Sequence, residues 1–75
     1  MANLMDLTPR EIEILQLVLA GRTNKAIAAE LGITEKTVEF HLDNIYNKVG
    51  VRTRVMVGIW ALRQDIAAEP REIPS

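Results

Sequence analysis

Apolar residues recur at helical spacing along most of the chain, and turn signals divide them into four segments. The first segment begins like a helix: Thr8 can act as the N-cap, Pro9 suits the first helical position, and Glu11 completes a capping box with Thr8. Gly21 ends this helix after about three turns. Its apolar face consists of Ile14, Leu15, Leu17 and Val18.

Residues 23–49 predict two further helices joined by a tight turn. Thr23 can cap a short helix, Gly32 permits the positive φ that ends it, and Thr34 can cap the helix that follows. That third helix covers about residues 35–49, and its buried seam is Val38, Leu42, Ile45 and Val49. Two helices joined in this way are how small proteins place a helix in the major groove of DNA. The pattern therefore favours a helix-turn-helix domain.

The fourth helix, about residues 54–67 and capped by Thr53, is apolar on nearly every side. One stripe is Val55, Ile59, Leu62 and Ile66; a second is Val57, Trp60 and Ala61, with Met56 between them. A domain of this size can bury only one stripe in its own core, so the other needs a second cover. We expect that cover to be a second copy of the chain; the alternative is burial inside a larger parent protein.

The domain organisation follows from these four helices. No segment has the pattern of a β-strand, so the predicted fold class is all-α, and the 75 residues suffice for one small domain. We expect residues 1–6 to form an N-terminal arm and residues 7–67 to form the helical domain. Residues 68–75 are polar with two prolines and are expected to be a flexible C-terminal tail.

Composition argues against several classes of protein. There is no cysteine, His41 is the only histidine, and the only serine is Ser75, so the chain offers no second histidine or cysteine as a metal ligand and no nucleophile constellation. We therefore predict no enzyme activity, no cofactor and no small-molecule ligand. The N-terminus lacks the order of a signal peptide, and the longest apolar run, Val55–Leu62, is too short to span a bilayer. These features predict a soluble cytoplasmic protein without a membrane partner.

The charge distribution permits DNA binding without requiring it. The net charge is −1, but residues 7–64 hold eight Lys or Arg and six Asp or Glu, which gives +2. Residues 65–75 hold three acids and one Arg, which gives −2, and Asp6 supplies the remaining −1. The predicted domain is thus mildly basic and its tail is acidic.

An ordered series of motifs runs from residue 7 to residue 63 almost without gaps. It comprises Leu7-Thr8-Pro9-Arg10-Glu11, Gly21, Thr23-Asn24-Lys25, Ile27-Ala28, Leu31-Gly32-Ile33, Glu35-Lys36-Thr37-Val38, His41, Asn44, Lys48, Val49-Gly50-Val51 and Thr53-Arg54. On these residues the chain resembles the LuxR-type (GerE-like) helix-turn-helix domain of bacterial transcription regulators. The resemblance implies a four-helix domain whose third helix reads the major groove and whose fourth helix forms dimers. Glu39 and Asp43 depart from it, because family members commonly carry Lys or Arg at one or both positions.

The resemblance and the exposed arc of the third helix together predict the contact residues. The residues expected to contact bases are Lys36, Thr37, Glu39, Phe40 and Asp43. Those expected to contact phosphates are Thr23, Asn24, Lys25, Thr34, Asn44 and Lys48, with Arg52 and Arg54 as weaker candidates. The expected dimer interface is Val55, Ile59 and Leu62.

Four of the groove-facing residues allow more than one interpretation. Phe40 can contact a thymine methyl group, or it can fold sideways against Lys36 or Asn44. Glu39 and Asp43 can accept a hydrogen bond from cytosine N4, repel the phosphates, or pair with Lys36 and Asn47 and orient them. A solvated surface side chain is the alternative for Lys36, and a packed, hydrogen-bonded role is expected for His41.

Two functions of different classes remain compatible with the sequence. The first is a sequence-specific DNA-binding transcription regulator that acts on double-stranded DNA as a homodimer, with the helix at about residues 35–49 in the major groove. The second is an interaction module that does not bind DNA, because its groove face is acidic, and that pairs with a related regulator and inhibits it.

Overall fold

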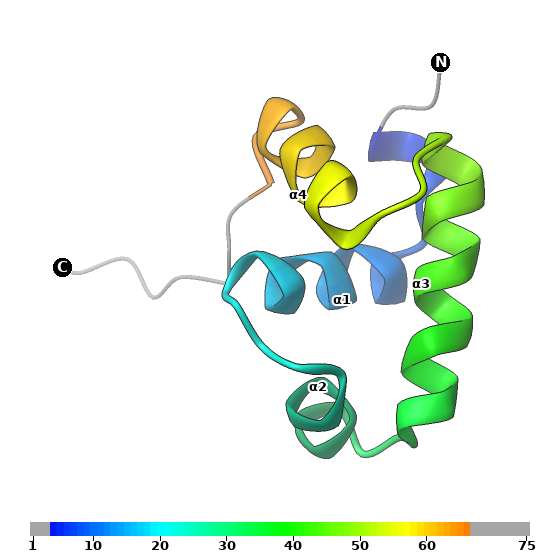
Figure 1. The fold of residues 1–75 in the computed structure, drawn as a ribbon, viewed down its shortest axis with the longest axis vertical. Coiled ribbons are helices and arrows are strands. Elements are labelled where there is room, and N and C mark those ends of the chain that lie inside the picture. Colours follow the sequence, from blue (N-terminus) through cyan, green and yellow to red (C-terminus); the bar gives the residue numbers. More distant parts are fainter. Residues whose placement is uncertain (1–3, 67–75) are drawn as a thin grey trace, which may run out of the picture.

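The fold is all-α, as the sequence predicts. The computed structural model describes residues 4–66, and this part of the chain contains no strand. The elements are a 3-10 helix η1 (Leu4–Asp6) and the α-helices α1 (Pro9–Leu19), α2 (Asn24–Leu31), α3 (Glu35–Val49) and α4 (Arg54–Arg63). In Figure 1, α1 lies at the centre, α2 and α4 lie on opposite sides of it, and α3 runs along one end of all three. Within residues 4–66, no helix combines the length and the apolar character that crossing a membrane requires.

Each α-helix begins at a threonine that the sequence identifies as its cap. The hydroxyl oxygens of Thr8, Thr23, Thr34 and Thr53 each accept a hydrogen bond from the amide three residues on, at 3.1 Å. These bonds satisfy amides that have no partner within the helix. In α1 the capping box is complete, because the Thr8 amide also donates to Glu11 Oε1 at 2.9 Å.

The fourth helix is shorter than predicted. It ends at Arg63 instead of residue 67, because Asp65 adopts the left-handed conformation with φ 61°. The Asp65 amide then donates to the Leu62 carbonyl and the Ile66 amide to the Ala61 carbonyl, each at 3.1 Å, which closes the helix end in a Schellman motif. Aspartate tolerates this conformation better than most residues, but no glycine marks the end in the sequence. The chain therefore turns and buries Ile66, which does not continue the stripe of Val55, Ile59 and Leu62.

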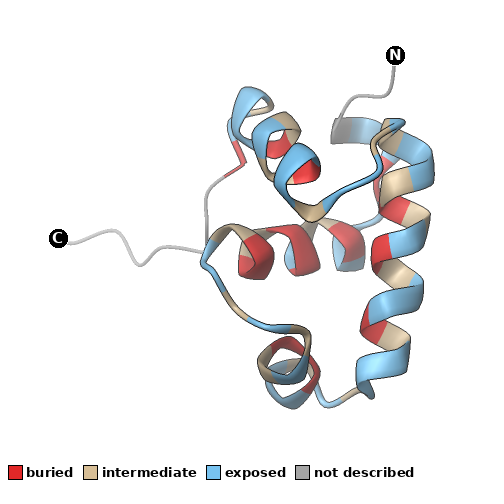
Figure 2. Ribbon diagram, in the orientation of Figure 1, coloured by how far each residue is buried: buried red, intermediate tan, exposed pale blue. Residues whose placement is uncertain are grey.

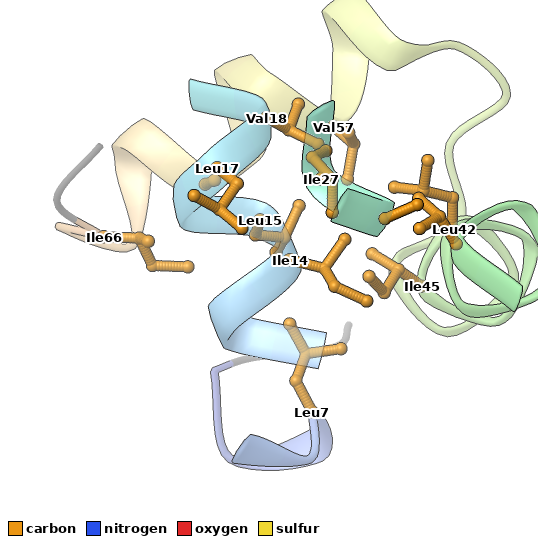
Figure 3. Close-up of a cluster of buried hydrophobic side chains, with 13 residues drawn as sticks. Leu7, Ile14, Leu15, Leu17, Val18, Ile27, Leu42, Ile45, Val57 and Ile66 are labelled. Atoms are coloured by element: carbon orange, nitrogen blue, oxygen red, sulfur yellow. The ribbon is translucent and has the colours of Figure 1, made fainter. Parts of the chain in front are cut away.

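The hydrophobic core is built around α1. Four α1 side chains, Ile14, Leu15, Leu17 and Val18, meet residues from every other α-helix (Figure 3). The predicted seam of α3 is confirmed, since Val38, Leu42 and Ile45 are buried and Val49 is half-buried. On α4, Val57 and Ala61 are fully buried, so this stripe belongs to the core of the single chain.

The two chain ends meet the predictions differently. Residues 4–6, which belong to the predicted N-terminal arm, form η1, and this short helix directly precedes the buried Leu7. The flexible tail predicted for residues 68–75, and residue 67 at the predicted domain boundary, lie outside the described residues.

One ion pair joins the start of α1 to the end of α3. Glu11 is the only buried charged residue among residues 5–66, with 4% of its surface exposed. Its Oε1 accepts from Lys48 Nζ at 2.8 Å as well as from the Thr8 amide. Burial by itself raises the pKa of Glu11, but the hydrogen bonds from Lys48 and Thr8 outweigh it and hold the pKa below its ordinary value of 4.5. The capping box is visible in the sequence, whereas the partner 37 residues away is not.

This pair predicts a pH-dependent stability. Because the pKa of Glu11 is lowered by folding, the stabilisation is complete above pH 4.5 and is lost as the pH falls through the lower folded value. Lys48→Met should lower the free energy of unfolding at pH 7 by about 1–2 kcal/mol, since water reaches the lysine end of the pair and moderates the loss. Urea denaturation at pH 7 and at pH 3.5 measures both effects, and the acid-induced loss should be smaller in the variant.

A matched control is Arg10→Met, which breaks the exposed pair between Arg10 and Glu13 at 3.2 Å. It should change the stability by less than about 0.5 kcal/mol. Equal stabilities for Lys48→Met and Arg10→Met would show that the buried pair does not stabilise the fold.

Candidate nucleic-acid interface

The α2–α3 unit has the geometry of a helix-turn-helix. Gly32 ends α2 with φ 68° and its amide donates to the Ala28 carbonyl, after which Thr34 caps α3. Ala28 is 5% exposed, where a small side chain lets the helices approach closely. The two helices pack directly on one another and on α1. The inner side of α3 is thereby fixed against the core, and Figure 2 shows exposed residues along its outer side.

Four of the five predicted base-contacting side chains reach solvent on this outer side. Lys36, Glu39, Phe40 and Asp43 are exposed. Thr37 is half-buried, and its hydroxyl lies 2.9 Å from that of Thr34, the residue that caps α3. Its hydroxyl is therefore engaged at the helix start, which leaves its methyl group as the part more available for contact.

Phe40 presents an uncovered aromatic surface. Its side chain is 62% exposed, and its ring meets that of His41 edge to face with the centroids 5.9 Å apart. His41 itself is half-buried. The contact with His41 orients the phenyl ring without removing it from water, so an apolar partner would still gain by covering it.

Glu39 and Asp43 are exposed carboxylates on the same side of α3. Within residues 4–66, no hydrogen bond or ion pair joins either of them to Lys36, Asn47 or any other residue. The structure therefore does not support the interpretation that Glu39 and Asp43 pair with Lys36 and Asn47 and orient them. Both carboxylates and the Lys36 ammonium are left facing solvent.

A groove of about 280 Å³ separates the outer side of α3 from the start of α2. Its lining residues are Asn24, Glu39, Leu42, Asp43, Tyr46 and Arg54. Burial raises the pKa of Tyr46, the positive charge of Arg54 opposes this, and the negative charge of Asp43 adds to it. The groove thus places the predicted base-contacting carboxylates beside the predicted phosphate-contacting Asn24.

The start of α2 is held by Arg54, a role that the sequence analysis missed. Arg54 Nη1 donates to Asn24 Oδ1 at 2.7 Å, and its Nη2 donates to the Arg22 carbonyl oxygen. An arginine 30 residues from its partner gives no local sequence signal, so the sequence supports only a general phosphate-binding role for it. Thr23 and Lys25, on either side of Asn24, are exposed.

The remaining predicted phosphate contacts differ in their surroundings. Thr34 is exposed and Asn44 is half-buried. Lys48 is the one whose charged group already has a partner inside the domain, the Glu11 carboxylate at 2.8 Å. The ion pair with Glu11 gives Lys48 a structural role that does not require DNA. Contact between Lys48 and phosphate stays a prediction.

The outer side of α4 is apolar and exposed. Val55 is 73%, Ile59 49% and Leu62 63% exposed, which are large fractions for aliphatic side chains. A groove of about 380 Å³ runs beside them against α1, lined by Val18, Leu19, Arg54, Val55, Gly58, Ile59 and Leu62. A second groove of about 240 Å³ shares Ile59 with the first, and its other lining residues are Val51, Met56, Trp60 and Arg63.

Comparison with known proteins identifies the family. The profile of the family described as bacterial regulatory proteins, luxR family, matches residues 5–61, which is most of the chain. The chain belongs to the luxR family. This confirms the resemblance drawn from the sequence motifs. It also confirms the predicted four-helix, all-α fold class.

Relatives and a solved structure agree with this assignment. Over 65 residues the chain is 45% identical to the transcriptional regulatory protein LnrK of Bacillus subtilis, covering 87% of this chain and 30% of LnrK. It is 42% identical over 60 residues to the nitrate/nitrite response regulator protein NarL of Escherichia coli, covering 80% of this chain and 28% of NarL. The crystal structure of the response regulator ChrA of a heme-sensing two-component system matches with a TM-score of 0.76 and 45% identity, covering 80% of this chain and 30% of ChrA.

The family is one of bacterial regulatory proteins, and all three relatives are described as regulators. The chain spans less than a third of the length of each of these three proteins. The likeness therefore concerns one part of each of those regulators.

Proposed function

We propose that this domain is a sequence-specific DNA-binding transcription regulator that inserts α3 into the major groove. The observation that carries the proposal is the exposed outer side of α3, fixed beside the capped start of α2 in a luxR family domain. A helix N-terminus favours phosphate through its free amides and its dipole, while side chains in the middle of α3 reach base edges. The bacterial cytoplasm, where the chromosome is accessible, is the expected site of action.

The proposed contacts divide by chemistry. Lys36 can donate to a guanine edge, Phe40 and the Thr37 methyl group suit a thymine methyl group, and Glu39 or Asp43 can accept from cytosine N4. The proposed contacts to phosphates at the edges of the DNA major groove are Thr23, Asn24, Lys25, Thr34, Asn44 and Lys48. The phosphate contacts would orient the domain, and the contacts on α3 would select the sequence.

The two unpaired carboxylates give the strongest support to a competing function. On the outer side of α3 the carboxylates of Glu39 and Asp43 outnumber the ammonium group of Lys36, so phosphates are repelled where a groove-binding helix normally attracts them. If this repulsion prevails, the domain is an interaction module that pairs with a related regulator through α4 and inhibits it.

We further propose that the regulator acts as a homodimer through α4. Val57 and Ala61 are buried in the core of the single chain, while Val55, Ile59 and Leu62 are available on the outside. Pairing two α4 helices about a two-fold axis would cover this stripe and remove its apolar surface from water, at roughly 25 cal/mol per Å². The two copies of α3 would then address major grooves about one DNA turn, ~34 Å, apart.

The contact model predicts different effects for two lysines. Lys36→Ala should weaken binding to a site selected from random DNA by about 1–3 kcal/mol and relax its sequence preference, because Lys36 faces the bases. Lys25→Ala should weaken binding to every sequence alike and reduce the salt slope by about one unit, because Lys25 faces phosphate. Electrophoretic retardation across a salt series measures both. Parent-like affinity of both variants at every salt concentration would contradict this docking of α3, and no retardation of DNA by the parent would favour the interaction module.

The carboxylates predict an effect of opposite sign. The double change Glu39→Gln with Asp43→Asn should tighten binding to the selected site and to random DNA together, by about three- to tenfold, because each carboxylate faces many phosphates and at most one base. Glu13→Gln, which removes a carboxylate from α1, is the control and should change little. Loss of affinity for the selected site with unchanged affinity for random DNA would instead show that a carboxylate reads a cytosine.

The dimer model predicts that the outside of α4 can be changed without unfolding the domain. Ile59→Glu should make the protein monomeric and reduce binding to a two-half-site operator, while the helical circular dichroism signal survives, because Ile59 is 49% exposed. The interface is small, so the parent dimer is expected to be weak without DNA and stronger when both half-sites are occupied. Analytical ultracentrifugation with and without operator measures this.

The matched control on the inner side of α4 is Val57→Glu, which should unfold the domain because Val57 is fully buried. An Ile59→Glu variant that still forms dimers on the operator would exclude this face as the pairing surface.

A further inference from the structure

Arg54 is the one residue that lines both the groove beside α3 and the larger groove beside α4. The first groove lies on the proposed DNA-reading side, and the second lies on the proposed pairing side. Arg54 is the first residue of α4, directly after the cap Thr53. It therefore stands where the pairing helix meets the DNA-reading unit.

The guanidinium group ties α4 to the start of α2 at two points. One nitrogen donates to the side chain of Asn24, the first residue of α2, and the other donates to the carbonyl oxygen of Arg22 in the preceding loop. Helix α4 packs mainly on α1 and α3, and α2 packs mainly on the same two helices. Arg54 thus adds a direct polar link between two helices whose main packing contacts are with other elements.

Arginine suits this link because its donors form a planar fork. Two nitrogens of one rigid group reach two acceptors at once, which restrains orientation as well as distance. Lysine keeps the charge, but it offers a single flexible ammonium group and does not reproduce the fork. The link is also half-buried, so water competes for these bonds less than at a fully exposed site.

We propose that Arg54 is a positioning residue that fixes the angle between the pairing helix α4 and the α2–α3 unit, and thereby sets the half-site spacing that the dimer accepts. This inference rests on the proposed function. One added base pair moves the second half-site by about 3.4 Å and rotates it by about a tenth of a turn. A dimer with a rigid link between α4 and α2 rejects that change, whereas a dimer with a loose link adapts to it.

The experiment measures spacing preference. Affinities are determined by fluorescence anisotropy for a selected two-half-site operator, for versions with one or two base pairs added or removed between the half-sites, and for a single half-site. The proteins are the parent, Arg54→Ala, Arg54→Lys and Arg52→Ala. Arg52 is the matched control, because it is exposed and, within residues 4–66, forms no hydrogen bond or ion pair, yet its loss changes the net charge equally. Circular dichroism melts confirm that each variant is folded.

The positioning role predicts a specific pattern. Arg54→Ala and Arg54→Lys should both reduce the preference for the best spacing over its neighbours, by about tenfold. Their single half-site affinity should stay within about threefold of that of Arg52→Ala, because the lost charge is the same or smaller. The parent and Arg52→Ala should keep the full preference. A nuclear magnetic resonance spectrum without DNA should show the Asn24 side-chain amide shifted in both Arg54 variants and unchanged in Arg52→Ala.

Other results overturn the inference in distinguishable ways. A loss in Arg54→Ala that is equal for single and paired half-sites, with an unchanged spacing preference, would make Arg54 a direct phosphate contact. Full retention of the preference by Arg54→Lys would show that charge alone suffices. Either result leaves the proposed function standing. Absence of DNA binding or of any spacing preference in the parent would instead overturn the proposed dimeric function and this inference with it.

Discussion

Burial of α1 by the other three α-helices is the constraint on which the rest of the structure depends. Ile14 and Leu15 are completely buried, and they form one hydrophobic cluster with Ile27 of α2, Ile45 of α3 and Val57 of α4 (Figure 3). In a domain this small, few residues can be fully removed from water, so each helix can give only one side to the core. The opposite sides of α3 and α4 are consequently left for solvent or for partners.

The chemistry of those two outer sides differs in a way that suits the two roles proposed for them. The outer side of α3 carries charge and one uncovered aromatic ring, with Lys36, Glu39 and Asp43 exposed beside Phe40. The outer side of α4 carries aliphatic side chains, with Val55 and Leu62 mostly in water. Charged and aromatic groups suit the edges of bases and the phosphates, whereas aliphatic groups suit a second copy of the same helix. The core therefore fixes the relative position of two surfaces with separate chemistries.

Polar links over long sequence distances refine the arrangement that the core establishes. The Glu11–Lys48 pair ties α1 to the end of α3, and Arg54 ties α4 to the start of α2. Both involve partly buried groups, for which a lost partner is costly. They act at the ends of helices, where packing alone leaves the most freedom. The end of α3 and the start of α2 are thus held by polar groups as well as by the hydrophobic core.

Local signals in the sequence determined most of the secondary structure and the division of each helix into an inner and an outer side. Thr8, Thr23, Thr34 and Thr53 act as caps through amides three residues away, and the positive φ of Gly32 follows from its missing side chain. The tertiary structure alone decided features that depend on distant neighbours. Ile66 is buried because the chain turns at Asp65. An aspartate in the sequence does not predict a helix end in the way that a glycine does. The partners of Glu11 and Arg54 lie 37 and 30 residues away, so hydrophobic periodicity and capping motifs, which extend over only a few residues, carry no information about them.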